Sequence, residues 1–92
     1  MKTATAMVAD PVGFHLRAAG RIVKLTKSFH SEVTVRYDGR TANAKSIMGL
    51  ASLAAEYGST VHLEVDGPDE EEALARLVHL IEVELARPEN GG

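Results

Sequence analysis

The 92-residue sequence has no cysteine and no tryptophan, and it has only two tyrosines and two phenylalanines. The absence of cysteine excludes a disulfide framework, a thiolate nucleophile and a zinc–thiolate site. The sequence also lacks an apolar run long enough for a signal peptide or a membrane-spanning helix. We therefore expect a cytoplasmic protein that needs no membrane insertion and no metal or other cofactor.

Positive charge is scarce as well, because ten lysines and arginines stand against thirteen aspartates and glutamates, which gives a formal net charge of −3. A domain that binds nucleic acid is normally basic, so we expect no nucleic-acid partner. The hydrophobic fraction of 45% is ordinary for a soluble globular chain, and 92 residues are enough for one core. We predict one domain over residues 1–88 and a disordered tail over residues 89–92.

Hydrophobic periodicity predicts seven elements in the order β-α-β-β-α-β-α. The predicted strands cover residues 2–8, 32–37, 40–44 and 60–65, and the predicted helices cover residues 16–28, 47–57 and 69–85. Asp38-Gly39 indicates a two-residue hairpin turn, because a type I′ turn needs positive φ at both central residues. One four-stranded antiparallel sheet with all three helices on one face would bury every apolar stripe in one core. The expected fold class is therefore α+β, an open-faced β-sandwich.

Residues typical of helix ends mark the second and third predicted helices. Ser46 takes the N-cap position of the second helix, and Gly58 is a plausible stop after it. Asp69 and Glu72 fit a capping-box-like pair at the start of the third helix. The apolar stripe of that helix comprises Leu74, Leu77, Val78, Ile81 and Leu85.

The stretch PVGFHLRAAGRIVKL, residues 11–25, places a histidine and an arginine at the predicted start of the first helix. Free amides of the first turn and the helix dipole favour negative charge there, and the same positive end opposes protonation of His15. Arg17 adds a guanidinium that matches phosphate oxygens in a bidentate manner, and Gly13 lets the backbone approach closely. Two interpretations remain open: His15 caps the helix as a structural residue, or it is a nucleophile that accepts a phosphoryl group.

Large apolar residues near both of the first two helix starts are a second observation. If these helices pack side by side, Leu16, Ile47 and Met48 form one exposed apolar patch around the histidine. A patch of this kind usually marks a site for a protein partner. The remaining histidines have no companions at metal-ligand spacing, and we expect them on the solvated surface, namely His30, His62 and His79.

Three segments of the chain, VGFHLRAA, NAKSIMGLASLA and GPDEEEALARLV, resemble the HPr family of histidine-containing phosphocarriers. These proteins belong to the bacterial phosphoenolpyruvate-dependent sugar phosphotransferase system. The resemblance extends over about residues 3–85 without gaps and includes the predicted order of elements. It implies the open-faced β-sandwich and a carrier that is acted on by enzymes rather than an enzyme itself.

The resemblance also implies roles for single residues. His15 would accept a phosphoryl group from enzyme I and pass it to the A domains of enzyme II components, with Arg17 stabilising the phosphate. Ser46 matches a serine that a dedicated HPr kinase/phosphatase phosphorylates in many members, and a phosphate there would repel an acidic partner. The surface that would dock partners comprises Leu16, Gly20, Lys24, Lys27, Ile47 and Met48. A monomer is expected.

The chain departs from the usual family motif at three positions near the histidine. Ala18 replaces a proline, which restores a backbone amide donor to the first turn. Leu16 is bulkier than the small residue usual there, and Val12 stands where a small polar residue is common. None of the three changes removes the nucleophile.

Two other functions fit parts of the same pattern. The first is an HPr-like carrier of a regulatory or nitrogen-related phosphorelay, which would use the same histidine with other partners. The second is a non-catalytic β-α-β-β-α-β module that binds RNA or a small ligand. An RNA-binding sheet would carry stacking aromatics and basic residues, whereas the predicted strands supply only Tyr37 and mixed charge.

Overall fold

The structure is a computed structural model that describes residues 1–87. Its strands are β1 (Lys2–Met7), β2 (Glu32–Tyr37), β3 (Arg40–Asn43) and β4 (Thr60–Asp66). Its helices are α1 (Leu16–Thr26), α2 (Ile47–Ser52) and α3 (Glu70–Glu82), followed by a 3-10 turn, η1 (Glu84–Ala86). The helices and strands follow the predicted order. The tail predicted over residues 89–92 lies outside the described residues.

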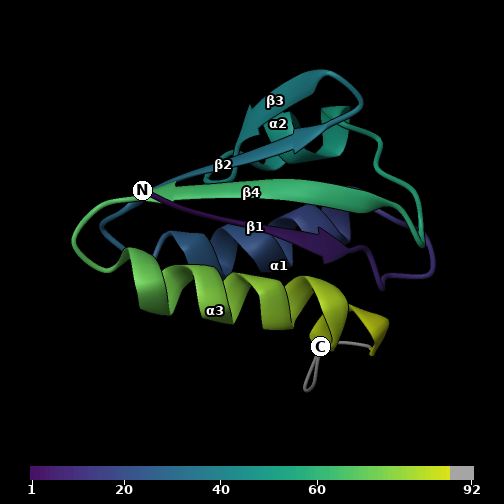
Figure 1. The fold of residues 1–92 in the computed structure, drawn as a ribbon. Coiled ribbons are helices and arrows are strands. Elements are labelled where there is room, and N and C mark those ends of the chain that lie inside the picture. The colour runs from purple at the N-terminus through teal and green to yellow at the C-terminus, as the bar shows by residue number, and fades with distance from the viewer. Residues whose placement is uncertain (88–92) are drawn as a thin grey trace.

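The four strands form one antiparallel sheet in the order β1-β4-β2-β3. Figure 1 shows α1 and α3 side by side along one face of this sheet, with α2 next to β3. The connections place sequentially distant strands together, since β4 lies between β1 and β2. This arrangement confirms the predicted open-faced β-sandwich with its helices on one face.

The core lies between the sheet and the helices and takes alternate residues from each strand. On β4, Val61, Leu63 and Val65 are fully buried, and they face buried helix residues that include Ile22 and Leu77. The strand residues between them are exposed or half-buried. Because a β-strand points successive side chains to opposite faces, these mostly polar residues occupy the uncovered side of the sheet.

The hairpin between β2 and β3 turns at Asp38 and Gly39, as the sequence predicts. Both residues have positive φ, 53° and 77°, and Tyr37 pairs directly with Arg40 across the turn. A two-residue loop of type I′ needs both left-handed conformations. The turn therefore sets the register of the edge strand β3.

The second helix is shorter than predicted, and the prediction that Gly58 ends it is wrong. α2 stops five residues before the predicted end, and the chain leaves it through Ala54, whose φ is 54°. The following segment bonds to distant backbone instead of continuing the helix. The oxygen of Ala55 accepts the amide of Phe14 at 2.8 Å, and the amide of Gly58 donates to Val8 at 2.8 Å. These long-range bonds outweigh the local helix propensity.

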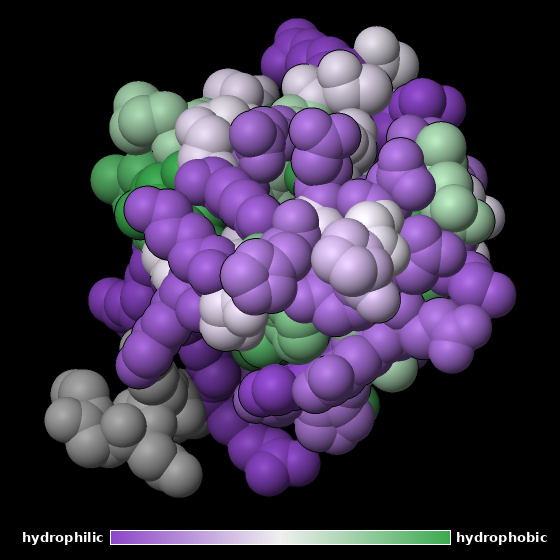
Figure 2. Space-filling model, turned by 90° about the vertical axis from the view of Figure 1, so that its left-hand side faces the viewer, coloured by the Kyte–Doolittle hydropathy of each residue, from purple (hydrophilic) through white to green (hydrophobic). Residues whose placement is uncertain are grey.

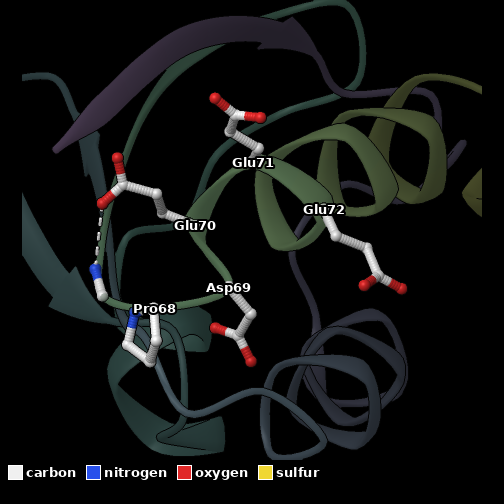
Figure 3. Close-up of a pocket in the computed structure, with 6 residues that line it drawn as sticks. Pro68, Asp69, Glu70, Glu71 and Glu72 are labelled. Atoms are coloured by element: carbon white, nitrogen blue, oxygen red, sulfur yellow. Dashed lines mark hydrogen bonds between the residues drawn. The ribbon is translucent and has the colours of Figure 1, made fainter.

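The start of α3 is not capped by the predicted Asp69–Glu72 pair. Asp69 is the N-cap residue, but its carboxylate makes no capping hydrogen bond. It accepts instead from the amides of the two residues before β2, at 2.9 and 3.0 Å, and from the hydroxyl of Ser31. Glu70, rather than Glu72, turns back and accepts the amide of Gly67 at 3.1 Å (Figure 3). The loop before α3 is thereby tied to the α1–β2 connection.

Acid should weaken the fold through Asp69. Hydrogen bonds hold the pKa of Asp69 below its ordinary value, first the one from the Ser31 hydroxyl and next the one from the His30 amide. A carboxyl with a depressed folded pKa stabilises the fold above its ordinary pKa, and that stability is lost as the pH falls through the folded pKa. We expect Asp69→Asn to lower the urea midpoint at neutral pH, because the new NH2 group would face a backbone donor.

The difference in urea midpoint between Asp69→Asn and the wild type should narrow as the pH falls from about 4 through the folded pKa of Asp69, which lies below its ordinary value, because the wild-type carboxyl is then protonated as well. Urea unfolding followed by circular dichroism across this range measures it. Asp38→Asn makes the same change in an exposed turn and should follow the wild type at every pH. Equal midpoints of Asp69→Asn and the wild type at neutral pH would contradict the expectation.

The two ends of the molecule carry different segments of the chain. The N-terminus and the start of α3 lie at one end, which is covered mainly by hydrophilic side chains (Figure 2). A hollow lined by Gly67–Glu72 also lies there (Figure 3). The loop between β1 and α1 lies at the other end (Figure 1). Within residues 1–87, no helix is long and apolar enough to cross a membrane.

Candidate functional site

The loop between β1 and α1 positions the histidine. Gly13 has a φ of 83°, and a Cβ atom at this position would lie 2.3 Å from the backbone oxygen of Ala55. The amide of Phe14 donates to that same oxygen at 2.8 Å, and the Phe14 side chain is buried in the core. Glycine is therefore required here both for its left-handed backbone and for its close approach to the neighbouring segment.

His15 is the N-cap residue of α1, at the helix start where the sequence predicts it. Its carbonyl accepts the amide of Ala19 at 2.9 Å, and its Nδ1 accepts the amide of Arg17 at 3.2 Å. Because a backbone amide can only donate, Nδ1 carries the lone pair of the ring. The side chain is 29% exposed, so another protein can reach it. The capping and nucleophilic interpretations thus use the same nitrogen and do not exclude each other.

The first turn of α1 offers further donors beside this nitrogen. The amides of Leu16 and Ala18 make no hydrogen bond to any residue in the described part of the chain. The Arg17 side chain is exposed and forms no hydrogen bond or ion pair within residues 1–87. Together with the helix dipole, these groups favour an anion attached to Nδ1. A proline at position 18 would lack this donor.

Asp10 belongs to the site, although the sequence analysis did not identify it. It is 7% exposed, and its Oδ1 lies 3.3 Å from Nε2 of His15. The same oxygen accepts the amide of Val12 at 2.9 Å, and the Asp10 carbonyl accepts the amide of Gly13 at 2.9 Å. An aspartate followed by a proline is typical of a turn, so its residue type gives no sign of a contact with the ring. Only the path of the loop places the carboxylate there.

The predicted partner-binding residues of α1 follow one side of the helix. Leu16 is 60% exposed, Gly20 is half-buried, and Lys24 and Lys27 are exposed. Spacings of three and four residues place them on successive turns of the same face. Leu16, Gly20, Lys24 and Lys27 therefore form a strip on the surface, which we call the docking strip. It is apolar at the end near His15 and basic at the other end.

The start of α2 carries the other predicted site residues. Ser46 is the N-cap residue, as predicted, and its hydroxyl accepts the amide of Gly49 at 3.1 Å. Ile47 is 41% exposed and Met48 is 72% exposed, so both are available on the surface.

α1 and α2 contact each other and run in opposite directions. The Thr26 hydroxyl, at the end of α1, donates to the oxygen of Ala44 just before α2 at 2.7 Å, whereas Phe14, before α1, bonds to Ala55 after α2. The eleven residues of α1 span about 16 Å. The start of α2, which carries Ile47 and Met48, thus lies toward the end of α1 opposite His15.

Comparison with known proteins places the chain in a family. The sequence profile described as "PTS HPr component phosphorylation site" matches residues 2–83. The chain belongs to the HPr family. The phosphocarrier protein HPr of Cupriavidus necator is 47% identical over 74 residues, which cover 80% of this chain and 83% of that protein.

Solved HPr structures agree with this assignment. The crystal structure of HPr-C-His from Thermoanaerobacter tengcongensis has a TM-score of 0.88 at 39% identity and covers 97% of this chain and 100% of that one. An HPr dimer from the same organism has a TM-score of 0.73 at 40% identity and covers 95% of this chain and 100% of that one. As an HPr-family member the chain is a phosphocarrier of the phosphotransferase system and not an enzyme. Membership favours the carrier over the RNA- or ligand-binding module that the strand pattern also allowed.

Proposed function

We propose that Nδ1 of His15 is the atom of this HPr-family protein that accepts and donates the phosphoryl group. The observation that carries the proposal is the place of Nδ1 at the N-cap, with its lone pair turned to the first-turn amides of α1. Attack of the lone pair on phosphorus forms the N–P bond while the donor's own bond to phosphorus breaks. The amide of Arg17, the neighbouring free amides and the Arg17 guanidinium then serve the phosphoryl oxygens as donors.

The proposed donor is enzyme I, and the proposed acceptors are the A domains of enzyme II components. Both would dock on the strip of α1 and the start of α2, because this surface begins at the histidine and exposes large apolar residues such as Leu16 and Met48. Lys24 and Lys27 at the far end would face acidic surfaces of these partners and steer their approach.

Ser46 is the proposed regulatory site, phosphorylated by an HPr kinase/phosphatase. Its hydroxyl faces the first turn of α2, where the N-terminal amides tolerate a phosphate. Because α1 and α2 run in opposite directions, Ser46 lies toward the end of α1 that is far from His15. A phosphate there would act by repelling an acidic partner from the docking strip rather than by changing the chemistry at His15.

Two further proposals and one alternative function concern the protein as a whole. We propose a monomer in a cytoplasmic location, although an HPr relative has been solved as a dimer, and light scattering measures the state of this chain. A carrier for a regulatory or nitrogen-related phosphorelay would use the same histidine with other partners. Transfer from His15 to a sugar-specific enzyme II A domain separates that role from sugar uptake.

The decisive experiment is the intact mass of the protein after incubation with its enzyme I, magnesium and phosphoenolpyruvate. One added phosphate that acid removes is expected, because an N–P bond is acid-labile. Coupling between phosphorus and one ring nitrogen in ¹⁵N NMR spectra should place it on Nδ1 of His15. ATP with the kinase/phosphatase should instead add an acid-stable phosphate on Ser46. No acid-labile phosphate from an enzyme I that charges a control HPr would overturn the proposal.

A further inference from the structure

The imidazole of His15 has a polar neighbour at each of its nitrogens. Nδ1 accepts the amide of Arg17, so the ring proton of the neutral form resides on Nε2. Nε2 in turn faces Oδ1 of Asp10 at 3.3 Å. One side of the ring is thus presented to the helix amides as an acceptor, and the other side is presented to a carboxylate as a donor.

The Asp10 carboxylate is fixed by its own loop rather than by the histidine. Oδ1 accepts the amide of Val12, and the Asp10 carbonyl accepts the amide of Gly13. The side chain of Asp10 is 10% exposed, compared with 29% for the side chain of His15. An acceptor that is already ordered and largely withdrawn from water interacts more strongly with a charge that forms beside it than a free surface carboxylate does.

We propose that Asp10 is a positioning residue of phosphoryl transfer, whose carboxylate keeps the proton on Nε2 while Nδ1 carries the phosphoryl group. The inference rests on the proposed function of His15. When the Nδ1 lone pair forms the N–P bond and Nε2 keeps its proton, the ring becomes a cation, which the neighbouring carboxylate stabilises. When the phosphoryl group moves on, the N–P electron pair returns to Nδ1 and the ring leaves as neutral imidazole.

The proton on Nε2 decides how readily the group is transferred. If Nε2 loses its proton, the phosphorylated ring is neutral and would have to leave as an imidazolate anion, which is a far poorer leaving group. A carboxylate beside Nε2 raises the pH at which the phosphorylated ring loses its proton, because an opposite charge favours the charged form of the ring. Asp10 therefore extends the pH range over which the carried group stays transferable.

Repulsion between Asp10 and the phosphoryl group opposes this effect only weakly. Nδ1 and Nε2 lie on different sides of the ring, so the phosphoryl group points away from Asp10 toward the first-turn amides and Arg17. Two further carboxylates lie near this loop, namely Glu56, whose backbone lies close to Gly13, and Glu82, which accepts the amide of Met7 at 3.0 Å, and both side chains are exposed. Within residues 1–87, Asp10 is the carboxylate placed at ion-pair distance from the ring.

Asp10→Asn separates the charge from the geometry. The amide oxygen of asparagine can accept Val12 N–H, as Oδ1 does in the wild type, and can face Nε2 from the same place, while the negative charge is gone. Asp10→Ala removes both the charge and the acceptor. Asp38→Asn, the same chemical change in the exposed hairpin turn, is the matched control.

The test follows hydrolysis of the phosphorylated proteins as a function of pH, after charging with enzyme I and phosphoenolpyruvate and removal of the enzyme. In Asp10→Asn the fall of the rate toward alkaline pH should shift to lower pH, so that the rate on this limb is about three- to tenfold below that of the wild type. The ¹⁵N resonance of Nε2 in the phosphorylated ring should titrate with the same shift. Asp38→Asn should follow the wild type.

The outcomes separate the inference from the function beneath it. Superimposable pH profiles and ¹⁵N titrations of Asp10→Asn and the wild type would overturn the role of Asp10 and leave His15 as the acceptor. A shift in Asp10→Asn with unchanged urea stability would support a charge effect, since a merely structural role would not move the profile. Failure of the wild type to be charged by its enzyme I would overturn the proposed function and this inference together.

Discussion

Replacing His15 by alanine is expected to abolish acid-labile phosphorylation completely, while the same change at His62 leaves it intact. Phosphoryl transfer needs a nitrogen lone pair that is both exposed and next to donors for the phosphoryl oxygens. Nδ1 of His15 meets both conditions at the N-terminus of α1. His62 lies on the uncovered face of β4, within a strand that pairs with β1 and β2, and not at the start of a helix.

The alanine variant also loses a helix cap, which costs about 0.5–2 kcal/mol of stability. His15→Asn removes this ambiguity, because the asparagine side chain can still accept the amide of Arg17 but offers no nucleophilic nitrogen. Both variants should remain uncharged by enzyme I and phosphoenolpyruvate, as read by intact mass. Acid-labile phosphate on a folded His15→Asn protein would show that another residue is the acceptor.

Gly13→Ala should unfold far more easily than the wild type, whereas Gly20→Ala should be slightly more stable. At Gly13 the backbone has a φ of 83°, and the new Cβ would lie 2.3 Å from a backbone oxygen that cannot move aside without breaking its bond to Phe14. Left-handed strain and forced displacement together are expected to cost about 2–4 kcal/mol. At Gly20, in the middle of α1, no atom apart from the backbone of the helix itself and the two neighbouring residues lies within 4 Å of the added Cβ. Alanine there should add about 0.5–1 kcal/mol.

Urea unfolding at neutral pH measures both changes, and charging by enzyme I shows their consequence for the site. Gly13→Ala should accept phosphate more slowly even under conditions where it is folded, because this loop positions both His15 and Asp10. Gly20→Ala separates stability from docking: a more stable protein that is charged normally would show that the docking strip tolerates a methyl group there. Equal urea midpoints for Gly13→Ala and the wild type would contradict the assigned role of the glycine.

Features that depend on a few consecutive residues were predictable from the sequence. The Asp38-Gly39 turn, the buried alternation of β4 and the capping positions of His15 and Ser46 all appear in the structure as predicted. A turn needs particular φ angles at two residues, and a cap needs one acceptor within three residues of the amides that it serves. Competing interactions from elsewhere in the chain do not reach these groups.

Features that join distant residues were predicted poorly. The sequence predicts that Asp69 caps its own helix, yet its carboxylate accepts the amides of His30 and Ser31, which lie 39 and 38 positions earlier in the chain. The second helix was expected to reach Tyr57, yet its last turn is replaced by hydrogen bonds to the loop before α1. In both places a local hydrogen bond and a long-range one compete for the same group, and residue types alone do not show which is formed.

By itself, the sequence determined the types and order of the elements, the polarity of the sheet faces and the placing of His15 at the start of a helix. Only the tertiary structure decided where α2 ends, that α1 and α2 run in opposite directions, and that the carboxylate of Asp10 faces Nε2 of His15. The physical reason is the range of the interactions. Periodicity, turns and caps act over a few residues, whereas these three features depend on the path that loops take once the sheet has brought distant segments together.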